Sequence, residues 1–170
     1  EDYVPAALDY ISWDGKIWGI PYRIETHAVI FNKGMWSAAG LDPEAPPQTW
    51  AELVSAGEAL TKDGQFGFAI TGGGEVGNTI FRSLPFIWMN GGNIISEDMT
   101  TAVVNEPAAV EAVTFYTDFY KKGISPDSTL ENDGTANRRL FIAEAVASYQ
   151  SGQFDVPSIN NENPNIDVGV

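Results

Sequence analysis

Short apolar runs and longer helical patterns alternate along the 170-residue chain. Segment 10–20 contains two apolar runs around Asp14-Gly15, a dipeptide that strongly favours a two-residue hairpin turn. Residues 28–31 are continuously apolar, which is typical of a strand buried on both faces. Similar runs predict strands at 66–70 and 146–149.

Helix signals lie between these strands. Thr49 and Glu52 form a capping-box pattern, which predicts a helix that starts at residue 50 and ends before Gly64. Pro107 lies where a first turn tolerates proline, and two apolar stripes indicate a helix over 107–123 that is buried on two sides. Asp133 is placed to cap a further helix. Other helices are expected at 35–39, at 78–89 and after residue 154.

The order of these elements predicts an α/β fold in one compact unit, because strands and helices alternate and no linker divides the chain. Apolar residues make up 44% of the sequence, but no run approaches the roughly 18 residues of a membrane span. We therefore expect a globular protein without a membrane span.

Charge and residue usage exclude several classes of function. The formal charge of −14 repels phosphate backbones, so we expect no nucleic-acid partner. The chain has no cysteine and a single histidine, His27, which argues against thiolate nucleophiles, serine triads and histidine or cysteine metal sites. We expect neither a metal nor a cofactor.

The glycine-rich loop 72–74 has only a superficial likeness to a phosphate-binding loop, since it lacks the lysine followed by serine or threonine. The start of the helix behind it can still present short polar groups to a neutral or anionic ligand, which makes Asn78 and Thr79 candidates. Paired carboxylates could serve a glycoside hydrolase, but the sequence does not define their separation.

Several short motifs occur in a distinctive order. They are Asp14-Gly15-Lys16-Ile17-Trp18-Gly19-Ile20-Pro21-Tyr22, Ile30-Phe31-Asn32-Lys33, Ala39-Gly40-Leu41-Asp42-Pro43, Thr49-Trp50-Ala51-Glu52-Leu53 and Trp88-Met89-Asn90-Gly91-Gly92. In this order they resemble the family-1 extracellular solute-binding proteins, whose best-known member is maltose-binding protein. The resemblance extends through 106–112 and 141–152, so it covers essentially the whole chain.

The resemblance implies a type II periplasmic-binding-protein fold, in which two α/β lobes close around a ligand at a hinge. Residues 1–170 would form one lobe, the carboxyl-side lobe, and the first lobe would be absent. Its crossing strands would lie near 20–24 and 166–170. The start at Glu1, without an initiator methionine or a secretion signal, suggests a processed or excised segment.

The resemblance also implies a set of ligand-binding residues. Glu25 lies seven residues before Asn32, where maltose-binding protein has a carboxylate near its sugar, and Tyr22 is its neighbour. Phe154 matches a tryptophan of many relatives, and such a ring can stack on the apolar face of a sugar. Gly152 would let the backbone approach the ligand. The full set is Tyr22, Glu25, Asn78, Thr79, Phe81, Arg82, Gly152 and Phe154.

Two positions depart from the family pattern. Glu144 stands where relatives often have glycine, and Gln153-Phe154 stands where they have Pro-Trp. The smaller ring of Phe154 argues against assuming maltose as the solute.

These features predict a bacterial periplasmic or extracellular protein that holds a sugar, oligosaccharide or polyol in an interlobe cleft. Its partners would be this solute, the missing first lobe and the permease subunits of an ABC transporter. Alternatives are a polyamine or a metal complex as the solute, mildly favoured by the acidic charge, and a carboxylate-dependent glycoside hydrolase. A sensory role is compatible with transport.

Overall fold

The computed structural model describes residues 3–170. The first two residues, where the sequence suggests a processed start, lie outside the described residues.

A three-stranded antiparallel sheet organises the main body. Its central strand β3 (His27–Asn32) pairs with β4 (Ser148–Gly152) on one side and with β5 (Val168–Gly169) on the other. The register of the β3–β4 ladder runs from His27 opposite Gly152 to Phe31 opposite Ser148. The strand predicted at 28–31 is therefore confirmed, whereas the one predicted at 146–149 begins two residues later.

Segment 66–70 was expected to be a strand, and this prediction was wrong. It meets residues 146–149 through two isolated bridges, from Phe66 to Val146 and from Ala69 to Tyr149, and the Ser148 hydroxyl donates to the Gly67 carbonyl. The backbone of Gly67 lies so close to that of Gly57 that a side chain at Gly67 would overlap the Gly57 carbonyl. The next amide, that of Phe68, donates to the Ile124 carbonyl instead of to β4. Close packing against a helix thus interrupts the ladder.

The predicted helices are present, with small shifts of their ends. Their bounds are α2 (Lys33–Ala38), α3 (Trp50–Leu60), α4 (Val76–Met89), α5 (Pro107–Lys121), the 3-10 helix η1 (Asp127–Leu130), α6 (Gly134–Ile142) and α7 (Asp155–Glu162). The capping box at the start of α3 is complete, because Thr49 accepts from the Glu52 amide and Glu52 accepts from the Thr49 amide. Asp133 caps α6 by accepting from the Ala136 amide at 2.7 Å.

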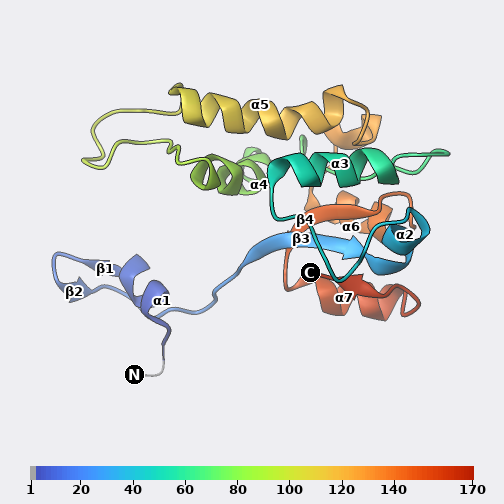
Figure 1. Cartoon of the computed structure of the whole chain (residues 1–170). Coiled ribbons are helices and arrows are strands. Elements are labelled where there is room, and N and C mark those ends of the chain that lie inside the picture. Colours follow the sequence, from blue (N-terminus) through green and yellow to red (C-terminus); the bar gives the residue numbers. More distant parts are fainter. Residues whose placement is uncertain (1–2) are drawn as a thin grey trace.

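Helices cover both faces of the sheet, with α3, α4 and α5 on one face and α6 and α7 on the other (Figure 1). Neighbouring residues of β3 point to opposite faces, so Val29 packs with the first group and Ile30 with the second. The predicted α/β class is confirmed. The helix α5 was predicted to be buried on two sides. One of its two apolar stripes is partly exposed to solvent, since Val113 is 39% exposed.

The amino-terminal segment extends away from this body (Figure 1). It consists of α1 (Pro5–Tyr10) and the predicted hairpin of β1 (Ser12–Trp13) and β2 (Lys16–Ile17). Asp14 and Gly15 make its turn with φ of 51° and 68°.

Only a small part of the two predicted crossing segments forms β-strands. Residues 20–24 are not a strand, and β5 takes up only two residues of 166–170. That these segments cross between lobes stays a prediction. Within the described part of the chain, the helices are too short or too polar to span a membrane.

Candidate functional site

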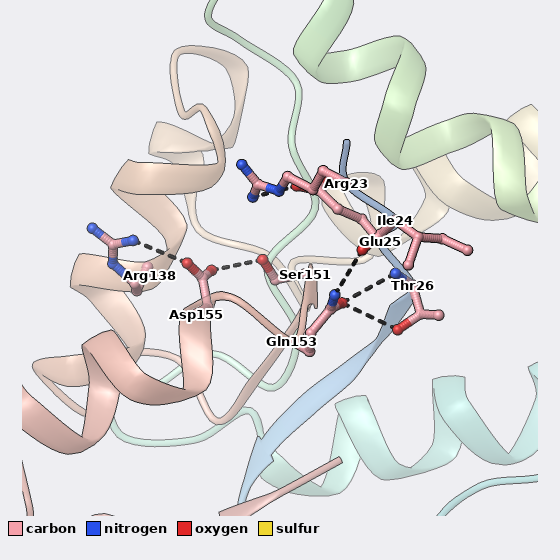
Figure 2. A network of polar contacts seen from close by, with 8 residues as sticks. All are labelled: Arg23, Ile24, Glu25, Thr26, Arg138, Ser151, Gln153 and Asp155. Carbon is pink, nitrogen blue, oxygen red and sulfur yellow. Dashed lines mark hydrogen bonds and ion pairs between the residues drawn. The ribbon is translucent and has the colours of Figure 1, made fainter. Parts of the chain in front are cut away.

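The candidate site lies where the chain enters β3 and leaves β4. His27, the first residue of β3, pairs with Gly152, the last residue of β4. Segment 23–26 and the turn at 152–155 therefore meet at one end of the sheet, and Figure 2 shows the polar contacts between them. Glu25, Gly152 and Phe154, which the sequence predicted as ligand-binding residues, are brought together here.

The side chain of Gln153 joins these two segments. Its Oε1 accepts from the Thr26 amide at 3.0 Å and from the Thr26 hydroxyl at 3.1 Å, and its Nε2 donates to the Ile24 carbonyl at 3.2 Å (Figure 2). The side-chain amide thus continues the β3–β4 ladder by one step. A proline at this position would lack these groups, so the departure from the family pattern has a structural consequence.

Asp155, the first residue of α7, holds the turn from its other end. The carboxylate is 2% exposed and accepts from Arg138 Nη1 at 2.9 Å, from the Tyr149 hydroxyl at 2.9 Å and from the Ser151 hydroxyl at 2.6 Å. Burial, together with the charge of Asp155, raises the pKa of Tyr149. This network fixes the backbone on both sides of Phe154 and was not predicted.

Phe154 and Glu25 both contact Arg23. The Phe154 ring packs over Gly152 and fills the space that a side chain there would need. The Arg23 guanidinium lies 5.5 Å from the centre of this ring and forms an ion pair with the Glu25 carboxylate. Sequence reasoning missed Arg23, although its spacing of two residues from Glu25 places both on one face of an extended segment.

Arg82 approaches the site from α4 and is buried, at 8% exposure. Its Nη1 donates to the Gln150 carbonyl of β4 at 3.0 Å. Its guanidinium also lies against Gly134, where a Cβ would come within 2.6 Å of Nη2. Burial and the positive charge of Arg82 lower the pKa of His27, whereas the charge of Glu25 opposes this effect.

The remaining predicted residues take no part in these contacts. Tyr22 and Phe81 are 99% and 67% exposed, while Asn78 and Thr79 in the first turn of α4 are half-buried. The structure does not bring Tyr22 and Phe81 into the packed part of the site. Their role as ligand-binding residues stays a prediction.

An apolar cavity of about 350 Å³ lies beside the site and shares His27 and Gln150 with it. Its walls include Val29, Trp50 and Phe86. Its walls are therefore mostly apolar, with few polar side chains. Over residues 3–170, no group of three or more acidic, histidine or cysteine side chains is arranged to hold a metal ion.

Comparison with known proteins identifies relatives of the whole chain. The sequence model of the family described as bacterial extracellular solute-binding protein matches residues 1–170. A probable amino-acid ABC transporter periplasmic-binding protein of Sinorhizobium fredii is 37% identical over 92 residues, which are 54% of this chain and 21% of that protein. The sn-glycerol-3-phosphate-binding periplasmic protein UgpB of Escherichia coli is 31% identical over 129 residues, 71% of this chain and 28% of UgpB.

Solved structures share the fold. An ABC transporter solute-binding protein of Thermotoga lettingae, bound with α-D-tagatose, superposes with a TM-score of 0.88 at 27% identity, over 98% of this chain and 43% of that one. The cyclic α-maltosyl-1,6-maltose binding protein of Arthrobacter globiformis gives 0.77 at 27% identity, over 97% and 41%. The chain therefore spans less than half the length of each of these proteins.

Proposed function

This chain belongs to the bacterial extracellular solute-binding protein family, and we propose that it forms the carboxyl-side lobe of a protein that captures a small polyhydroxylated solute. Its fold is a single α/β lobe of the two-lobed type II periplasmic-binding-protein architecture, matching 43% of the tagatose-bound structure. In this proposal the other lobe is supplied by residues outside the chain, and the solute lies between the two lobes.

The observation that carries the proposal is the meeting of Glu25 and Phe154 at the end of the sheet, joined through Arg23. A carboxylate accepts hydrogen bonds from two hydroxyl groups at once and so orients a sugar or a polyol. An aromatic ring packs against the apolar C–H face of the same molecule. The Gln153 contacts hold the two segments that carry these groups in register (Figure 2).

The relatives support a polyhydroxylated solute. Tagatose, a cyclic maltosyl-maltose and glycerol 3-phosphate all carry several hydroxyl groups, and each is named with a relative that is at least 27% identical. One relative is named as a probable amino-acid transporter protein, so amino acids belong in any binding test.

The proposed roles of the other residues follow from their positions. Asn78 and Thr79 would contact solute from the start of α4, with Arg82 one turn further along the same helix. Tyr22 and Phe81, which are largely exposed, would reach the solute from its edges once the second lobe is present.

We place the protein in the bacterial cell envelope, where it would deliver its solute to the permease subunits of an ABC transporter. Two of its relatives are named as periplasmic proteins. The protein would perform no chemistry on the solute.

The test is a binding panel on the two-lobed protein that contains this chain. Calorimetry and tryptophan fluorescence would be measured with sugars, polyols, amino acids and spermidine. We expect a sugar or polyol to bind, and Glu25→Gln and Phe154→Ala each to lower its affinity by about tenfold or more. Glu44→Gln is the control, because this exposed carboxylate pairs with Lys33 away from the site.

Other outcomes would contradict the proposal. Binding of spermidine alone would indicate a cationic solute. Hydrolysis of a glycoside, abolished by Glu25→Gln, would indicate an enzyme.

A further inference from the structure

We propose that the solute carries an oxyanion group, a phosphate ester or a carboxylate, and that Arg82 together with Arg23 binds it. The inference rests on the proposed function, since it names the class of solute for the same site. It is carried by the placement of the arginine side chains.

Arg82 is a buried cation without an acidic partner. The chain has four arginines, and two of those around the site are paired, Arg23 with Glu25 and Arg138 with Asp155. Within residues 3–170, no carboxylate forms an ion pair with Arg82. A buried charge is costly unless it is paired, and one carbonyl oxygen does not neutralise a guanidinium with five N–H donors.

The position of Arg82 links this charge to the candidate site. Its hydrogen-bond partner is the main-chain carbonyl of Gln150, which lies two residues before Gly152 on β4. The Phe154 ring packs over Gly152. Arg82 therefore reaches the end of β4 that leads to this ring, and its charge acts on His27, which pairs with Gly152.

Arg23 supplies a second guanidinium, which lies 5.5 Å from the centre of the Phe154 ring. Its present partner is Glu25, the carboxylate proposed to accept hydroxyl groups from the solute. If Glu25 turns to the solute, the Arg23 guanidinium, whose side chain is 59% exposed, becomes free to bind an anionic group of the solute. Guanidinium groups bind phosphates and carboxylates through two parallel hydrogen bonds, which suits an oxyanion on a polyol.

The net charge of the chain determines how an anionic solute can be attracted. With a net charge of −14, these 170 residues repel anions at long range, and only nine basic residues are present to attract them. An acidic lobe that holds Arg82 and Arg23 at one end of its sheet is suited to capture an anionic group by short-range contacts.

The experiment compares ligands that differ only in this group, on the two-lobed protein. Glucose is compared with glucose 6-phosphate and with glucuronate, and glycerol with glycerol 3-phosphate, by calorimetry at two salt concentrations. We expect one anionic member to bind about tenfold or more tightly than its neutral counterpart, with the advantage falling as salt rises. The phosphate and carboxylate arms distinguish the two oxyanions.

Each other outcome is decisive. If a neutral sugar or polyol binds as tightly as its anionic counterparts, the inference is wrong and the proposed function stands. If no sugar or polyol, neutral or anionic, binds, the proposed function fails as well.

A substitution of Arg82 tests whether this residue causes the preference for the anionic ligand. Arg82→Met is expected to reduce the preference for the anionic ligand to about equal binding, while Arg139→Met, an exposed change on the same protein, keeps it. An unchanged preference in Arg82→Met would overturn the assignment.

A measurement on the unaltered protein covers the case in which Arg82→Met does not fold. His27 is the only histidine of these 170 residues, and its ring protons, assigned by comparison with His27→Gln, can be followed by NMR during a pH titration of the two-lobed protein. The charged groups that act on it are Arg82 and Glu25. An oxyanion bound to Arg82 should raise the pKa of His27, and a neutral polyol should raise it less. Equal shifts would contradict the inference.

Discussion

Asp155 determines the geometry of the turn that carries Phe154. Three donors converge on its buried carboxylate, and one of them, Arg138, carries a full charge. The turn therefore depends on an ion pair that is largely removed from water. Removing the charge from one member of such a pair leaves the other without compensation, which is more destabilising than losing a neutral hydrogen bond.

We expect Asp155→Asn to lower the free energy of unfolding by about 3 kcal/mol, the lower end of the range for a broken buried pair, because Arg138 keeps some access to water. Urea denaturation measures the change. Asp118→Asn is the matched control, since Asp118 pairs with Lys121 at the surface and should lose less than about 1 kcal/mol. Equal losses in both variants would show that the Asp155 network is not a buried pair in solution.

Asp155→Asn should also weaken solute binding beyond its effect on stability, because the backbone of the Phe154 turn would no longer be fixed. Among molecules that remain folded, a solute affinity unchanged from the original protein would indicate that the network stabilises the fold without positioning the site.

At the scale of elements, the sequence predicted features whose partners lie within a few residues. The Thr49 cap, Pro107 in the first turn of α5 and the Asp133 cap are such features, and each is present. Their hydrogen bonds are fixed by local backbone geometry, so the order of residue types is enough to predict them.

Contacts between distant segments were not predictable in this way. Gln153 bonds Thr26 across 127 positions, and Arg82 bonds Gln150 across 68. The failed strand at 66–70 has the same cause, since apolar periodicity does not reveal that Gly67 must pass close to Gly57. The candidate site is built mostly from such distant contacts. Those of its members that were predicted, Glu25, Arg82, Gly152 and Phe154, came from the resemblance.

The capping box of α3 gives a test at this scale. Thr49→Ala removes the acceptor for the Glu52 amide, and we expect a loss of about 1 kcal/mol in the free energy of unfolding. Thr114→Ala is the control, because its exposed hydroxyl bonds only the Val110 carbonyl within α5, and it should change stability by less than about 0.5 kcal/mol. A similar small effect in Thr49→Ala would mean that packing alone holds the start of α3, for example through the Trp50–Phe115 stack at 4.1 Å.

At the scale of the whole molecule, the amino-terminal segment exposes an unusual amount of aromatic surface. Trp13, Trp18 and Tyr22 are between 66% and 99% exposed, and Ile20 between them is also exposed. A contiguous run of large apolar side chains at the surface is typical of an interface. The proposed second lobe would cover part of this surface and would face the same end of the sheet as Glu25 and Phe154.

This arrangement predicts how binding depends on the rest of the protein. Residues 1–170 alone should bind the solute about 100-fold or more weakly than the two-lobed protein, because half of the contacts and the closure step are absent. Calorimetry with the same sugar or polyol on both proteins measures the ratio, and a melting curve of the isolated chain first establishes that it is folded. Matching affinities would show that the contacts at Glu25, Phe154 and Arg82 make a complete site by themselves. In that case closure would contribute little to affinity, and its role would be limited to presenting the bound state to a transporter.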